Sequence, residues 1–152
     1  MKVFSPYRIA AALLVVFCVM HTAGGMFSEP SFGAEADAVF ASMKAVHFDF
    51  NGSDSTWHGF WFGFGLTSSV FMLFSALVAW KLDSVPRESW PAVAAIAWAL
   101  VAAQAANAVL SWAYFFAGPG VFATAITLLV AVGAFRKGRA AAAAAPGAVA
   151  AA

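Results

Sequence analysis

Two histidines and two amide side chains lie within long apolar stretches of this sequence, where a polar group costs free energy and its position is therefore informative. They are His21, His58, Gln104 and Asn107. An imidazole is neutral or switchable near physiological pH, which suits it to ligating a haem iron or a metal, or to passing a proton. These four residues are therefore the candidate cofactor-binding or ligand-binding site.

The spacing of these residues favours no particular metal. No two histidines lie four residues apart, no Cys-x-x-Cys-His pattern occurs, and the apolar stretches contain no Asp or Glu. Zinc and di-iron sites are built from such patterns, so we predict no metal site. Haem ligation by His21 and His58 stays open as an alternative. We predict no catalytic residue, because neither Cys18 nor any serine has a positioned base in the sequence.

A packing role is the main expectation for the same side chains. Gln104, Asn107 and Ser111 are spaced three and four residues apart, so they share one face of a helix. Such groups can hydrogen-bond across membrane helices, at an average of about 0.6 kcal/mol each. Binding of a quinone, a lipid headgroup or haem is the alternative.

Composition determines which elements must hold these residues. The chain has 152 residues, of which 63% are hydrophobic and 10% are charged. Soluble domains are about half apolar and about a quarter charged. So few charges could not cover a surface that faces water, which excludes a cytosolic enzyme domain, a nucleic-acid binder and a disordered protein. An integral membrane protein remains.

Four apolar stretches are long enough to cross a bilayer, which takes roughly 20 residues. Because lipid cannot satisfy exposed backbone groups and the stretches do not alternate with a period of two, they must be helices. The predicted fold is all-α, a four-helix transmembrane bundle in a single domain over residues 1–139. The spans are expected at about 9–27, 57–80, 90–116 and 118–135, and an Ala-rich cytoplasmic tail at 140–152.

Basic residues set the expected orientation, since Lys and Arg concentrate in cytoplasmic segments. Of the eight basic residues, only Lys44 lies in the long loop 28–56. Both termini are therefore expected in the cytoplasm and this acidic loop outside. The alternative is a cleaved signal peptide that ends near Ala23-Gly24-Gly25.

The outer loop is expected to contain a short amphipathic helix over 34–48, followed by a turn over 51–56 that leads into the second span. Ser55 or Thr56 can cap that span, and Asp54 suits its positive end. Gly59 and Gly63 form a small-xxx-small pair that lets another helix approach closely.

Several of these segments resemble a family of small, uncharacterised bacterial inner-membrane proteins with four spans. The similar segments are His21-Thr22-Ala23-Gly24-Gly25, Met43-Lys44-Ala45-Val46-His47-Phe48, Trp57, Phe60, Gly63-Phe64-Gly65-Leu66 and Tyr114-Phe115-Phe116-Ala117-Gly118-Pro119. The resemblance implies a multi-pass topology in the bacterial inner membrane and carries no activity or cofactor.

The expected function is that of a structural or accessory membrane component without catalysis. Its expected partners are the lipid bilayer, a membrane protein or a second copy of the chain, and no nucleic acid. The alternative is a helical bundle that binds a small ligand, a quinone or haem through His21, His58, Gln104 and Asn107.

Overall fold

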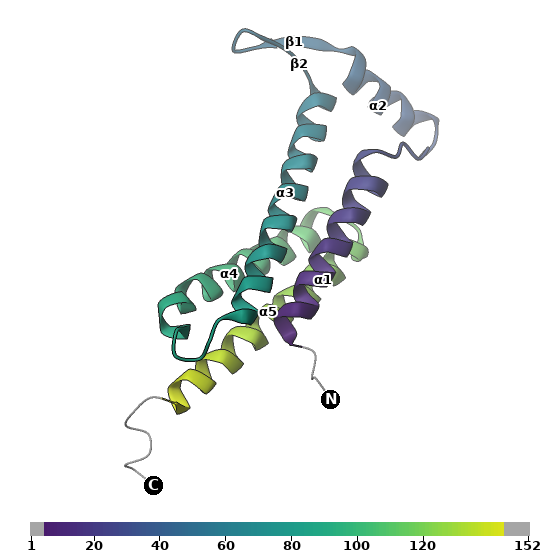
Figure 1. Ribbon diagram of the computed structural model, residues 1–152. Helices are drawn as coiled ribbons and strands as arrows, with labels where there is room; N and C mark the ends of the chain where they lie inside the picture. Colours follow the sequence, from purple (N-terminus) through teal and green to yellow (C-terminus); the bar gives the residue numbers. More distant parts are fainter. Residues whose placement is uncertain (1–4, 145–152) are drawn as a thin grey trace. The chain divides into compact units, whose positions relative to one another are not determined.

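The computed structural model describes residues 5–144, which are mostly helical (Figure 1). This confirms the predicted all-α fold with four long apolar helices. The elements, in chain order, are α1 (Pro6–Val19), the π-helical segment η1 (Met20–Met26), α2 (Ala34–Ala45), β1 (His47–Phe50), β2 (Ser53–Thr56), α3 (Trp57–Ser84), α4 (Trp90–Tyr114) and α5 (Ala117–Ala143).

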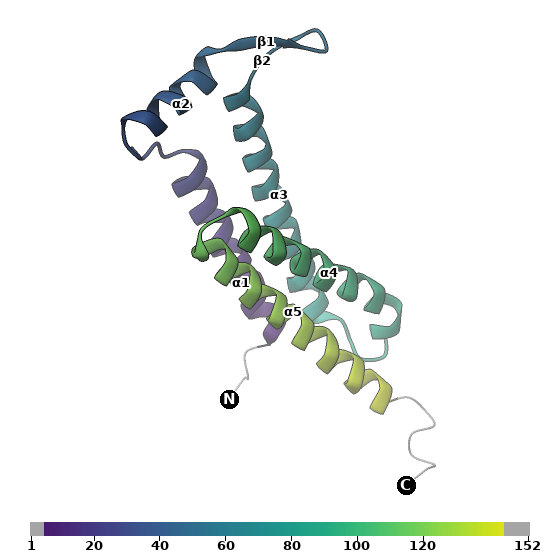
Figure 2. The ribbon, with the colours of Figure 1, turned by 180° about the vertical axis from the view of Figure 1, so that it is seen from behind.

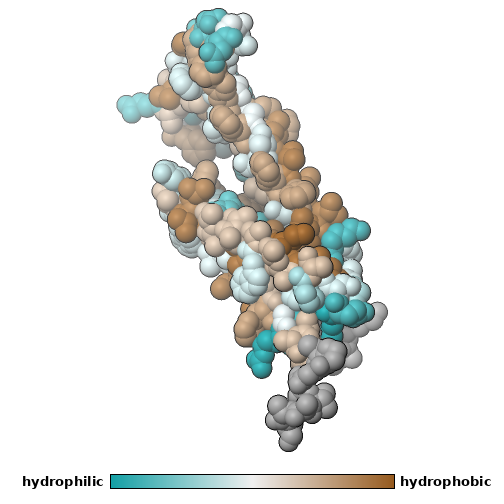
Figure 3. All heavy atoms as spheres, turned by 90° about the vertical axis from the view of Figure 1, so that its left-hand side faces the viewer, coloured by the Kyte–Doolittle hydropathy of each residue, from teal (hydrophilic) through white to brown (hydrophobic). Residues whose placement is uncertain are grey.

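Four helices are long and apolar enough to cross a membrane. They are Pro6–Met26, which joins α1 to η1, together with α3, α4 and α5. Large apolar side chains are exposed along them; on α3, Val70, Phe71 and Phe74 are each more than 60% exposed. Figure 3 shows hydrophobic residues over much of the visible helical surface. Such a surface suits lipid, so the chain is a multi-pass membrane protein.

The last helix is longer than the sequence predicted. It continues to Ala143, so residues 140–143, which were predicted to belong to the tail, are helical. Alanine has the highest helix propensity of all residues, and an Ala-rich stretch extends a helix that has already formed. The rest of the predicted tail, residues 145–152, lies outside the described residues.

The chain divides into two compact units, and both α1 and α3 contribute to each of them. The first unit comprises residues 1–17 and 73–152, and the second comprises residues 18–72. In the first unit α4 and α5 pack against each other (Figure 2), and the core is made largely of small residues. Ala10, Ala79, Ala97 and Val130 are fully buried there. Small side chains let helix backbones approach closely, as in membrane bundles generally.

The second unit contains the predicted outer loop. The predicted short helix is present as α2, over Ala34–Ala45, but it ends before the predicted Phe48, and His47 and Phe48 belong to strand β1. The segment predicted as a simple turn is instead an antiparallel hairpin, in which His47 pairs with Thr56 and Phe50 with Ser53. Its two-residue turn has positive φ at both positions, 54° at Asn51 and 82° at Gly52. These φ values are those of a type I′ turn, which Asn-Gly favours because both residues tolerate positive φ.

Candidate functional site

A polar network joins the end of the first span to α3 within the second unit. Nε2 of His21, in η1, lies 3.0 Å from the carbonyl oxygen of Gly65. A carbonyl can only accept, so Nε2 carries the proton and donates it. A π-helical turn holds an extra residue, and such turns often occur at functional sites.

Hydroxyl and thiol groups extend this network along the two helices. The hydroxyl oxygens of Thr22 and Ser69 are 2.8 Å apart. The Cys18 thiol donates to the backbone carbonyl of Ser69 at 3.5 Å. We call Cys18, His21, Thr22, Gly65 and Ser69 the α1–α3 network. Ser69 is only 8% exposed, and its buried hydroxyl has two partners, the Thr22 hydroxyl and, at 3.4 Å, the Gly65 carbonyl of its own helix.

Glycine at position 65 permits this close approach. A Cβ atom placed there would overlap the sulfur of Met26, at the far end of a flexible side chain of η1, so the Met26 side chain would have to move. The small-xxx-small pattern in the sequence instead predicted that another helix approaches α3 at Gly59 and Gly63. Within the described residues nothing lies within 4 Å of a Cβ at Gly63, and a Cβ at Gly59 would meet Thr56 of its own turn. The small residues that mediate contact are therefore Gly65 and Ser69.

His58 lies in an aromatic cluster at the start of α3. Its ring centroid is 5.3 Å from that of Phe40, 5.5 Å from that of Trp61 and 6.0 Å from that of Phe62. Phe40 belongs to α2, so the cluster joins α2 to α3. Edge-to-face and stacked rings at these separations add to the burial of apolar surface. His58 therefore packs against these rings, and its role in binding a ligand stays a prediction.

The two amides of the predicted site belong to the first unit. Gln104 is 5% exposed, and its Oε1 has no hydrogen-bond partner among the described residues. Asn107 is half-buried one turn further along α4. A buried acceptor without a partner costs about 1–3 kcal/mol. His21 and His58 belong to the second unit, so a joint site of all four residues stays a prediction.

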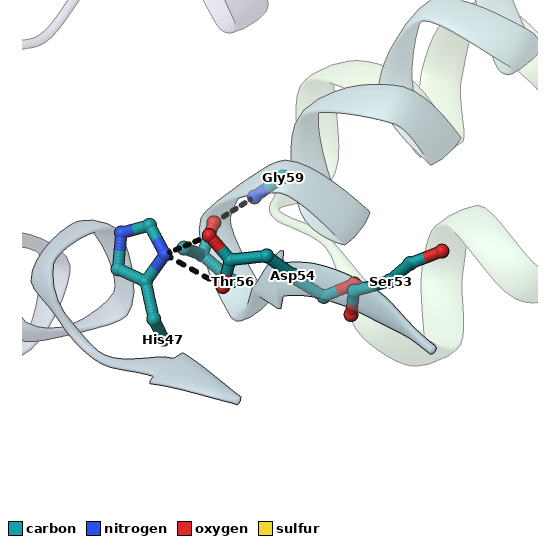
Figure 4. A network of polar contacts seen from close by, with 6 residues as sticks. His47, Ser53, Asp54, Thr56 and Gly59 are labelled. Atoms are coloured by element: carbon teal, nitrogen blue, oxygen red, sulfur yellow. Dashed lines mark hydrogen bonds and ion pairs between the residues drawn. The ribbon is translucent and has the colours of Figure 1, made fainter. Parts of the chain in front are cut away.

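The hairpin carries a polar network of its own (Figure 4). Nδ1 of His47 lies 2.9 Å from both carboxylate oxygens of Asp54. The predicted cap of the second span is confirmed, because the backbone N–H of Gly59 donates to the Thr56 hydroxyl at 3.0 Å. Asp54 was expected at the positive end of that helix, but it pairs with His47 across the hairpin.

Two carboxylates fix the chain that leads into α2. The Asp37 carboxylate accepts hydrogen bonds from the Ser31 hydroxyl at 2.6 Å and from the backbone N–H of Phe32 at 3.0 Å. These bonds hold the pKa of Asp37 below its usual value. A hydrogen bond and the positive charge of Lys44 likewise lower the pKa of Glu29.

Three segments predicted to be cytoplasmic meet in the first unit. Nε of Arg8, in α1, lies 2.6 Å from a carboxylate oxygen of Asp83, at the end of α3. Nζ of Lys137, in α5, donates to the backbone carbonyls of Asp83 at 2.5 Å and Val85 at 2.7 Å. The basic residues of α1, of the α3–α4 connection and of α5 therefore gather at one end of this unit.

Sequence reasoning missed Gly65, Ser69 and Asp83. Gly65 and Ser69 are four residues apart, so the small-xxx-small pattern that singled out Gly59 and Gly63 also fits this pair. No sequence pattern pointed to the pairing of Asp83 with Arg8, 75 residues away.

Among residues 5–144, no group of three or more His, Cys, Asp or Glu side chains is placed to hold a metal ion. Comparison of the chain with known protein families, with curated proteins and with solved structures finds no match.

Proposed function

We propose that this protein is a structural or accessory component of the bacterial inner membrane and performs no catalytic step. In this proposal both termini are cytoplasmic, and α2 and the hairpin form an external surface that meets a membrane-protein partner. The observation that carries the proposal is the α1–α3 network. His21 donates to the Gly65 carbonyl, and Thr22 bonds Ser69. These polar groups are used in binding one helix to another.

Mutual pairing argues for packing because it leaves few groups for a ligand. Once Nε2 of His21 donates to a carbonyl, only the Nδ1 lone pair can coordinate a metal. His58 has aromatic neighbours on α2 and α3. Interhelical hydrogen bonds in membranes are modest, at about 0.6 kcal/mol on average, but several in one contact specify how two helices pair.

One observation favours the second candidate function, which is binding of a quinone, haem or another small ligand. The buried Oε1 of Gln104 has no partner among residues 5–144. A ligand hydroxyl, such as that of a quinol, would satisfy this acceptor. Asn107, one turn further along α4, would be the neighbouring polar group within the same unit.

An absorption spectrum and a pair of serine variants test the proposal. We expect protein purified in mild detergent to show no Soret band and no co-purifying quinone by mass spectrometry. Ser69→Ala should lower the free energy of unfolding by about 0.6 kcal/mol, and by no more than about 1.7 kcal/mol. Ser68→Ala is the matched control, because Ser68 is exposed and bonds only to its own helix at Phe64.

Two results would overturn the packing proposal in favour of ligand binding. One is a Soret band that disappears in His21→Ala. The other is a quinone that co-purifies with the wild type and is lost in Gln104→Ala. Equal stability of Ser69→Ala and Ser68→Ala would show instead that the α1–α3 network does not hold the two helices together.

A further inference from the structure

We propose that a basic pocket in the first unit binds a phosphate group, supplied by the headgroup of an acidic phospholipid. The pocket has a volume of about 310 Å³, at the lower end of the range for ligand sites. It lies between the start of α1, the α3–α4 connection and α5. Its lining residues are Ser5, Pro6, Tyr7, Arg87, Gly133, Arg136, Lys137 and Ala140.

Three cations from two segments converge on this pocket. Arg87 comes from the α3–α4 connection, and Arg136 and Lys137 come from α5. Among the described residues, neither arginine has a hydrogen bond or an ion pair with a carboxylate, and the Asp83 carboxylate is paired with Arg8. Guanidinium groups bind phosphate oxygens in a bidentate manner, so two uncommitted arginines at one pocket suit an anion.

Lys137 contributes a fixed positive charge to the pocket. Its ammonium donates to the carbonyls of Asp83 and Val85, which uses two of its three N–H groups and holds it in place. One N–H group remains for a ligand. The ammonium is anchored on neutral carbonyls and forms no direct ion pair within residues 5–144, although the nearby Asp83 carboxylate, which is paired with Arg8, also attracts it.

Tyr7 supplies an independent sign that a polar partner is missing. It lines the pocket, it is 1% exposed, and its hydroxyl has no hydrogen-bond partner among the described residues. Tyr7 therefore places a covered hydroxyl, without a partner in the described part of the chain, in the wall of the pocket. Burying an unpaired hydroxyl is costly, and a phosphate oxygen would provide the acceptor.

A lipid is the favoured source of the phosphate because of where the pocket lies. Its residues stand at the ends of membrane spans, at the end of the unit where basic residues gather. Basic pockets between transmembrane helices on the cytoplasmic side are typical binding sites for acidic lipid headgroups. The choice of a lipid rests on the cytoplasmic orientation proposed above, whereas the phosphate site itself depends neither on that orientation nor on the structural role.

The experiment is a binding titration of the full chain in mild detergent, read by native mass spectrometry. The probes are phosphatidylglycerol, phosphatidylcholine and soluble glycerol phosphate. We expect phosphatidylglycerol to bind more tightly than phosphatidylcholine, and Arg87→Gln and Arg136→Gln each to weaken it about fivefold. Tyr7→Phe should weaken it as well. The matched control is Lys81→Gln, which removes the same charge from the same region but does not line the pocket.

The outcomes separate the source of the phosphate from the site itself. Tight binding of phosphatidylglycerol without glycerol phosphate supports a lipid headgroup. Equal binding of glycerol phosphate supports the phosphate site but assigns it to a soluble ligand. The proposal is overturned if the two arginine variants bind phosphatidylglycerol as the wild type does, or if Lys81→Gln loses as much affinity as they do.

Discussion

Gly133 of α5 leaves room for the Tyr7 ring of α1, so this glycine lets the two helices pack closely. A Cβ atom at this position would lie 2.8 Å from two atoms of the Tyr7 ring and 3.0 Å from a third. The ring is 1% exposed and packs 6.4 Å from the Trp90 ring, centroid to centroid. An aromatic ring held on several sides cannot yield to an added methyl group, so this position requires glycine.

We therefore predict that Gly133→Ala lowers the free energy of unfolding by about 1–3 kcal/mol, the usual cost of overpacking. The measurement is an unfolding titration in mixed micelles. Gly63→Ala is the control, because open space surrounds a Cβ there among the described residues. That variant should be neutral or slightly stabilising, since alanine has a higher helix propensity than glycine. Equal stabilities of the two variants would contradict the assignment of Gly133.

Single polar residues were predicted from the sequence less well than apolar segments. His21 was recognised because a polar group stands out in an apolar stretch, and it does bond to another helix. Its partner on α3 was not predicted. Pairing depends on how two helices face each other, and the periodicity of one helix does not contain that information.

At the scale of elements, Asp37 fixes the entry to α2 through its bonds with Ser31 and Phe32. These bonds favour the charged carboxylate and lower its pKa in the folded chain. At pH values above the ordinary pKa of a carboxyl group, the Asp37 carboxylate therefore stabilises the start of α2. This contribution is lost as the pH falls through the lowered pKa of Asp37.

The measurement is amide hydrogen exchange at Phe32, corrected for intrinsic rates. Protection of this amide should decrease as the pH falls from the ordinary carboxyl pKa through the lowered pKa of Asp37. Asp37→Asn should abolish the pH dependence, whereas Glu35→Gln in the same helical turn should keep it. Protection that stays constant on acidification would refute this role of Asp37.

The hairpin depends on the backbone conformation of its two-residue turn. Gly52 has φ of 82°, so Gly52→Ala should destabilise the hairpin by about 1 kcal/mol. The loss should appear as faster exchange of the β1 and β2 amides. Asn51→Gly is the control, since glycine accepts φ of 54° freely and should preserve the pairing. Unchanged exchange in Gly52→Ala would contradict the type I′ turn.

The hairpin also shows how much of an element a sequence can reveal. Asn-Gly between residues that can pair is a strong local hairpin signal, and Asn51-Gly52 carries it. The polar strand Ser53–Thr56 has no alternation of apolar residues, so it was predicted as a turn. The long helices were predicted within a few residues at most ends, because a bilayer imposes a continuous apolar stretch that no other fold needs.

At the scale of the whole molecule, the distribution of charge carries the proposed orientation. Arg8, Asp83 and Lys137 lie together although they are far apart in the sequence. The first span therefore begins at the side where the second and fourth spans end, as four successive crossings of a membrane require. The same side holds Arg87 and Arg136. Positively charged segments stay in the cytoplasm, so we propose this side as the inner one.

Labelling of single cysteines in intact cells is the most direct test of this orientation. In a Cys18→Ala background, a membrane-impermeant maleimide should label Ser42→Cys in α2 and should label Ser84→Cys at the end of α3 only after the cells are opened. Both serines are exposed, and Cys18 is the only native cysteine. Labelling of Ser84→Cys in intact cells, with Ser42→Cys protected, would contradict the account.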